Sequence, residues 1–314
     1  MSTSTATEPR PRAKPRARLG DVLFAGTARG AGIVILIALA GVAVFLTLEG
    51  FPAFSATGSA LSGASSFLGY VWPLVFGTLL AATLALIIAT PLAIGVAMVI
   101  AFYAPRRIAG TVSYLIDLLA AVPSVVYGLW GIGFLGPRLK PLYAWLEDHL
   151  GFLPFFAGPA SSTGRTILTA SIVLAIMVLP IITAICREIF AQTPQLHREA
   201  AMALGATRWE TMRLAVFPYA RSGMVSAVML GLGRALGETM AVAMVLSASG
   251  IVTFNLISSS NPATIASNIA LNFPEATGLK VNVLIASGLV LFVITFAVNF
   301  AARAIVARSQ REAR

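Results

Sequence analysis

The sequence predicts an all-α integral membrane protein, and three observations carry that prediction. Of the 314 residues, 58% are hydrophobic and only 11% are charged, and the mean hydropathy is +0.88. Soluble domains carry about 25% charged residues, so this chain has too few polar side chains to cover a globule. Six apolar runs are each long enough to cross a hydrocarbon core of about 30 Å. Because lipid cannot satisfy an open strand edge, these runs are expected to be helices.

The elements are expected in a simple order along the chain. Residues 1–20 are basic and rich in Pro, Ser and Thr, and they predict a disordered cytoplasmic tail. Residues 21–314 form the transmembrane domain, in which a polar loop at 187–221 separates the fourth span from the fifth. The six spans are expected near 27–48, 71–103, 111–135, 165–186, 222–249 and 280–307.

The distribution of Lys and Arg predicts the orientation of these spans. With the N-terminus inside, 17 basic residues fall on cytoplasmic segments, four fall outside, and Arg234 lies within a span. This asymmetry places both termini in the cytoplasm by the positive-inside rule. The net charge of +10 is therefore a feature of membrane topology, and no nucleic-acid partner is expected.

Three prolines interrupt the predicted spans, namely Pro91, Pro123 and Pro180. Each lacks an amide donor and tends to kink a helix, so bent packing and a hinge are equally compatible with them. Cys186, the single cysteine, is expected to pack in the interior. No metal site or catalytic residue is expected, because the HExxH and GxSxG patterns are absent and no His, Ser and Asp set converges within the spans. An intramembrane enzyme is thus a remote alternative.

The loop at 187–221 is the most polar stretch after the tail. It is expected to form two short amphipathic helices joined at Gly205, with Pro218 opening the fifth span. Its motif is Glu199-Ala200-Ala201, then three residues, Gly205, then nine residues and an apolar ending at Pro218. This pattern resembles the EAA loop of bacterial ABC importer permeases. In that family the loop is the coupling helix that docks on a cytoplasmic ATPase.

Two further segments narrow the resemblance. Together with the loop, the stretches AAVPSVVYGLWG (120–131) and GLGRALGETMAV (231–242) resemble the PstC-type permease subunit of phosphate importers in the bacterial cytoplasmic membrane. The resemblance implies a type I, MetI-like permease fold that carries inorganic phosphate. It also implies a second permease subunit (PstA-like), an ATPase dimer (PstB-like) that uses ATP-Mg, and an extracytoplasmic phosphate-binding protein (PstS-like). No cofactor is expected in this chain, which has no GxxxxGK[ST] loop.

Three other readings remain open from the sequence. The chain could be the sister PstA-type permease or a permease for another oxyanion, such as sulfate or molybdate. An ion-coupled secondary transporter is a more remote alternative than these two, since such a protein would show inverted repeats and would need no loop that docks on an ATPase.

Arg234 and Glu238 are the candidates for the substrate pathway. Counted from the start of the fifth span, both lie near the midplane, where an unpaired charge costs several kcal/mol. Their i,i+4 spacing predicts one helical face and partial neutralisation of each other. A structural ion pair would account for this, but an Arg oriented by Glu is also suited to phosphate oxygens, and we favour that function. Asp117 is a weaker candidate for packing or gating.

Overall fold

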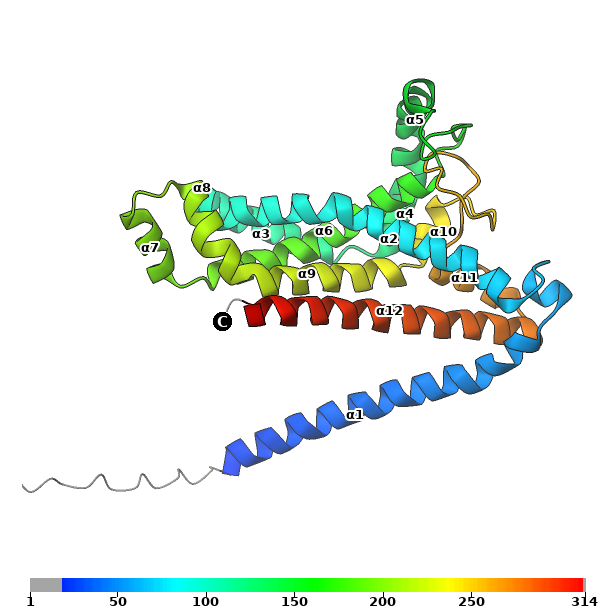
Figure 1. Ribbon diagram of the computed structural model, residues 1–314, viewed down its shortest axis with the longest axis horizontal. Helices are drawn as coiled ribbons and strands as arrows, with labels where there is room; N and C mark the ends of the chain where they lie inside the picture. The colour runs from blue at the N-terminus through cyan, green and yellow to red at the C-terminus, as the bar shows by residue number, and fades with distance from the viewer. Residues whose placement is uncertain (1–18, 313–314) are drawn as a thin grey trace, which may run out of the picture. The chain divides into compact units, whose positions relative to one another are not determined.

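The computed structural model describes residues 19–312, and its regular structure is helical (Figure 1). The predicted tail lies outside the described residues as far as residue 18. The chain divides into two units, residues 1–45 and 46–314. The described part of the first unit is the beginning of one long helix, α1 (Leu19–Gly50), which runs on into the second unit.

The second unit is a bundle whose longest helices are α2, α6, α9 and α12. Five helices within residues 19–312 are long and apolar enough to cross a membrane, and a bent pair raises that number to six. The predicted all-α membrane fold is therefore confirmed. After α1 the order is η1 (Phe51–Ser55), η2 (Gly58–Leu61), α2 (Phe67–Met98), η3 (Val99–Tyr103), α3 (Arg106–Ala120), α4 (Ser124–Trp130), η4 (Gly131–Leu135), α5 (Gly136–Leu150), α6 (Ile167–Ala191), α7 (Gln195–Ala203), α8 (Arg208–Thr211), η5 (Met212–Val216), α9 (Phe217–Gly237), α10 (Met240–Val245), α11 (Ile265–Asn272), η6 (Phe273–Glu275) and α12 (Leu279–Glu312).

The core of the bundle is a seam between α2 and α6. Buried alanines recur every four residues along one face of α2, so their side chains form a single stripe. Small residues let two membrane helices approach closely, and van der Waals contact then holds them together. Larger side chains of α6 fill the other side of the seam, and the Thr183 hydroxyl donates to the Ala93 carbonyl at 3.3 Å. The alanine stripe comprises Ala81, Ala85, Ala89, Ala93 and Ala97.

The third predicted span is not one straight helix, contrary to the expectation for 111–135. The segments Arg107–Ala120 and Ser124–Leu150 meet at 93°. Pro123 causes the break, because it disfavours helical geometry at the preceding residue and is itself extended, with ψ 141°. The Tyr127 hydroxyl donates to the Leu119 carbonyl at 2.9 Å and so ties the two segments across the break. Pro91 and Pro180, by contrast, stay inside the continuous helices α2 and α6.

The fifth predicted span also differs from the expectation. It begins early, since α8, η5 and α9 form one continuous helix from Arg208 to Gly237. The second of the two expected loop helices is therefore the first turn of the span. The helix stops at Gly237, and only the short α10 follows before an irregular segment at 246–264.

That irregular segment is fastened to the start of α6 by Asn261, which is completely buried. Its side-chain oxygen accepts from the Ile167 amide at 3.2 Å, and its amide nitrogen donates to the Ser258 carbonyl at 2.8 Å. Arg165 adds a second link by donating to the Leu246 carbonyl at 3.3 Å. These bonds hold the chain beyond α10 against the bundle.

Candidate functional site

Arg234 lies one turn before the end of α9. One turn earlier on the same side of the helix, Gly231 packs on α6, where a Cβ would come within 2.8 Å of the Ile182 side chain. The glycine therefore permits the close approach of α9 to α6. Gly233 and Gly237 differ, because a Cβ at either would meet nothing within 4 Å. Of these three glycines, Gly231 alone is required for the packing of α9 on α6.

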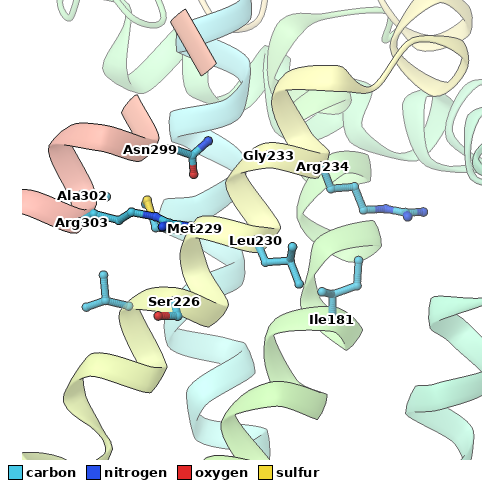
Figure 2. A pocket seen from close by; sticks show the side chains of 10 residues that line it. Ile181, Ser226, Met229, Leu230, Gly233, Arg234, Asn299, Ala302 and Arg303 are labelled. Atoms are coloured by element: carbon cyan, nitrogen blue, oxygen red, sulfur yellow. The ribbon is translucent and has the colours of Figure 1, made fainter. Parts of the chain in front are cut away.

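A cavity of about 790 Å³ opens beside Arg234, between α6, α9 and α12. Figure 2 shows Arg234 extending from one side of α9 towards Ile181, with Asn299 and Arg303 of α12 on the other side. The lining is otherwise largely apolar. It comprises Ile181, Val225, Ser226, Met229, Leu230, Gly233, Arg234, Asn299, Ala302 and Arg303.

The expected pairing of Arg234 with Glu238 is absent. Among the side chains that the structure describes, the one ion pair joins Arg187 to Asp117 at 3.7 Å. Glu238 lies beyond the end of α9 with ψ 124°, so the two residues are not on one helical face. Its carboxylate instead accepts from the Ala241 amide at 3.1 Å, in the first turn of α10. The i,i+4 argument was wrong because it assumed a continuous helix.

Arg234 is consequently a cation without a carboxylate partner. Its Nε is buried and has no hydrogen-bond partner among the described residues. An unpaired guanidinium next to an apolar cavity attracts an anion more strongly than it would in water, because the local dielectric constant is low. Arg also presents its donors as a planar fork that matches phosphate oxygens. The geometry is therefore suited to binding an anion without displacing an internal counter-ion.

The second candidate region is the α7–α8 loop at the other end of the bundle (Figure 1). Gly205 has φ +86°, a conformation that favours glycine. Its amide donates to Met202 and the next amide, of Ala206, donates to Ala201, which together form a Schellman motif that ends α7. The predicted bend at Gly205 is confirmed. After it, Thr207 and Glu210 form a reciprocal capping box that starts α8.

The helix α7 carries Glu199, Ala200 and Ala201 on a surface that the bundle leaves open. None of its residues is buried. Large apolar side chains are exposed on and next to it, most of all Leu204, which is 90% exposed. The others are Leu196, Met202, Trp209, Leu214 and Tyr219. An exposed apolar cluster of this kind is typical of a protein-binding surface.

Sequence reasoning missed several residues of these regions. Asn299 and Arg303 line the Arg234 cavity from α12, and their polar character within an apolar run is the signal that could have found them. Asp117, the weaker candidate, pairs with Arg187 of α6.

Residues 89–311 match the family described as the inner membrane component of binding-protein-dependent transport systems. The chain belongs to this family. The family consists of inner-membrane proteins. In agreement with this, the chain has several helices that are long and apolar enough to span a membrane.

Curated relatives narrow the family. The chain is 44% identical over 301 residues to the phosphate transport system permease protein PstC 2 of Mycobacterium tuberculosis, which covers 92% of each chain. It is 38% identical over 306 residues to the phosphate transport system permease protein PstC of Mesorhizobium japonicum, covering 93% of this chain and 92% of the relative. The resemblance to PstC-type permeases is thus confirmed.

Solved structures show the same fold at low identity. An inward-facing MetNI methionine ABC transporter chain matches with a TM-score of 0.53 and 16% identity, covering 76% of this chain and 93% of that one. A chain of a bacterial ABC transporter for the acidic polysaccharide alginate matches with a TM-score of 0.57 and 18% identity, covering 92% and 96%. These likenesses confirm the MetI-like permease fold.

Proposed function

We propose that this chain is the permease subunit of an ATP-driven importer and forms the path for inorganic phosphate. The assignment of phosphate as the substrate rests on the 44% identity, over 92% of both chains, to a relative named as a phosphate permease. The unpaired guanidinium of Arg234 beside its cavity supports an anion as the cargo. We place Arg234 in contact with the anion, and Glu238 as the residue that holds the helix break open next to it.

The proposed complex contains three other kinds of subunit. A PstA-like permease would complete the path, a PstB-like ATPase dimer would use ATP-Mg, and a PstS-like protein would deliver phosphate from outside. Glu199, Ala200, Ala201 and Gly205 would form the contact with the ATPase, because no residue of α7 is buried and large apolar side chains are exposed on and next to it. The hinge candidates are Pro91, Pro123 and Pro180. Of these, Pro123 has the most direct support as a hinge, because the chain bends by 93° there.

The experiment is ATP-dependent uptake of labelled phosphate by proteoliposomes that contain the assembled complex, with excess sulfate or molybdate as competitor. We expect uptake that neither competitor abolishes and that Arg234→Gln reduces at least about tenfold, the effect of losing a charge-assisted contact. Arg213→Gln is the matched control, because Arg213 is exposed and outside the cavity. Uptake of sulfate as fast as that of phosphate would contradict the assignment of phosphate as the substrate. Unaltered phosphate uptake by Arg234→Gln would show that Arg234 does not contact the anion.

The proposed orientation places α7 in the cytoplasm. In a background lacking Cys186, a cysteine at Leu204 should react with a membrane-impermeant maleimide only in inverted vesicles. A cysteine at Phe152, which is 78% exposed after α5, should react only in intact cells. Labelling of the Leu204 position from outside would contradict the predicted topology.

A further inference from the structure

A second basic cavity lies at the α7 end of the molecule, separate from the one at Arg234. Its volume is about 240 Å³. From Thr211 on its wall to Arg234 the helix rises roughly 35 Å at 1.5 Å per residue. The cavity is lined by Phe102, Arg198, Met202, Arg208, Thr211 and Met212.

Both arginines of this cavity lack a carboxylate partner among the described side chains. The Arg198 guanidinium lies over the Phe102 ring, 4.8 Å from its centroid, which fixes the cation without neutralising it. Two acids are close to these arginines in sequence. Glu199, next to Arg198, forms no ion pair with it. Glu210, two residues after Arg208, is already engaged, since its carboxylate accepts from both the amide and the hydroxyl of Thr207 at 2.8 Å. Two positive charges therefore face one small cavity without an internal anion.

Thr211 adds an independent observation. The residue is only 6% exposed, and its hydroxyl has no hydrogen-bond partner within the described chain. A helical threonine ordinarily donates to the carbonyl four residues earlier, but the Thr207 carbonyl is bonded by the Thr211 amide alone, at 2.9 Å. A buried hydroxyl without a partner is costly, so its presence beside two free arginines indicates a missing acceptor.

We propose that this cavity binds a phosphate group, held by Arg198, Arg208 and the Thr211 hydroxyl. Two guanidinium forks and a hydroxyl offer donors in several directions, which suits the tetrahedral oxygens of phosphate better than the two coplanar oxygens of a carboxylate. Arg198 belongs to α7, whereas Arg208 and Thr211 belong to α8. A bound phosphate group therefore ties α7 to α8 across the Gly205 bend and fixes the angle of the helix that we propose docks on the ATPase.

The group can come from inorganic phosphate or from the head group of an anionic lipid. The first source rests on the proposed function, because an importer releases phosphate on this side of the membrane. The second requires only that the cavity lie at the membrane surface. Binding experiments on the assembled complex in nanodiscs distinguish the two sources. The parent protein in these experiments is the Arg234→Gln variant, so that phosphate bound in the proposed path does not contribute to the signal.

In nanodiscs of phosphatidylcholine, equilibrium binding of labelled inorganic phosphate to this parent should be saturable. Arg198→Gln/Arg208→Gln should weaken it at least about tenfold, and the isosteric Thr211→Val by several-fold, because each removes donors to the anion. Arg213→Gln, on the same helix but outside the cavity, should leave it unchanged. In nanodiscs with phosphatidylglycerol, native mass spectrometry should instead detect a retained lipid, lost in the same variants, if the lipid is the source.

The proposal fails if neither inorganic phosphate nor phosphatidylglycerol is retained, or if the variants bind as well as the parent. It also fails if Arg198→Gln/Arg208→Gln only releases the ATPase subunit, since the arginines then serve a protein contact. Size-exclusion chromatography of every variant reports assembly. Because binding is measured without transport, a failure here is distinct from a failure of the proposed function, which the uptake of Arg234→Gln decides.

Discussion

The two helix interruptions that bound the long helix from Arg208 to Gly237 are built in opposite ways. At Gly205 the backbone conformation makes the turn, because φ is +86° and two backbone hydrogen bonds of a Schellman motif close it. At Gly237 φ is not positive, and a side chain bonds the backbone beyond the break, since the Glu238 carboxylate accepts from the Ala241 amide in the first turn of α10. The first interruption therefore needs a residue that tolerates positive φ, such as glycine or asparagine, whereas glycine is replaceable by ordinary residues at the second. A glycine in a sequence does not by itself distinguish these two cases.

The largest effect is expected at the Gly237 end, in the double variant Arg234→Gln/Glu238→Gln. Two residues that neutralised each other would recover function when both charges are removed. The structure separates them, so we expect phosphate uptake, normalised to assembled complex, to stay at least about tenfold below wild type in the double variant, as in Arg234→Gln alone. Recovery to near wild-type uptake would show that they form a structural pair after all.

A smaller effect is expected at the other interruption, from Gly205→Val. A β-branched residue at positive φ is strained by about 1–2 kcal/mol, although a Cβ there meets nothing within 4 Å. We expect the complex to insert and assemble but to hydrolyse ATP with less phosphate moved per ATP. Gly205→Asn is the matched control, because asparagine tolerates this conformation. Equal coupling ratios in Gly205→Val and wild type would mean that the angle between α7 and α8 is unimportant.

The smallest effect is expected from Gly237→Ala. Gly237 is the last residue of α9, its φ is not positive, and an added Cβ has open space. Alanine is the better helix former by up to about 1 kcal/mol, so thermal stability of the complex should be unchanged or slightly raised. A marked loss of stability, measured by the temperature at which the complex dissociates, would show that the Gly237 break needs glycine as Gly205 does.

The sequence predicted those structural features whose physical cause lies within a short stretch of the chain. The apolar runs predicted the long helices, because crossing a membrane fixes both length and composition. Gly205 was predicted correctly, since its glycine acts through its own backbone. The 93° break was only suggested by Pro123, because a proline permits a bend without setting its angle.

The candidate site was predicted in composition but not in geometry. Arg234 was found because an ionisable residue in a membrane span is rare. The predicted pairing of Arg234 with Glu238 was wrong, because α9 ends at Gly237 and the Glu238 carboxylate bonds the Ala241 amide beyond that end. Asn299 and Arg303 join the cavity from more than sixty residues further along the chain, a proximity that only the tertiary packing of α9 and α12 produces.

The π-helical turn at Met212–Val216 sets the phase between the two ends of the long helix. The Phe217 amide bonds to Met212, five residues earlier, so the turn holds one residue more than an α-helical turn, just before Pro218. Pro218 could not donate to Leu214, and the wider turn accommodates that missing bond. Removing one residue here would let the ladder close as an α-helix and would rotate everything beyond it by about 100° relative to α8. Arg234 would then leave its side of α9 while α7 stayed in place, so the length of this turn determines which way the arginine faces.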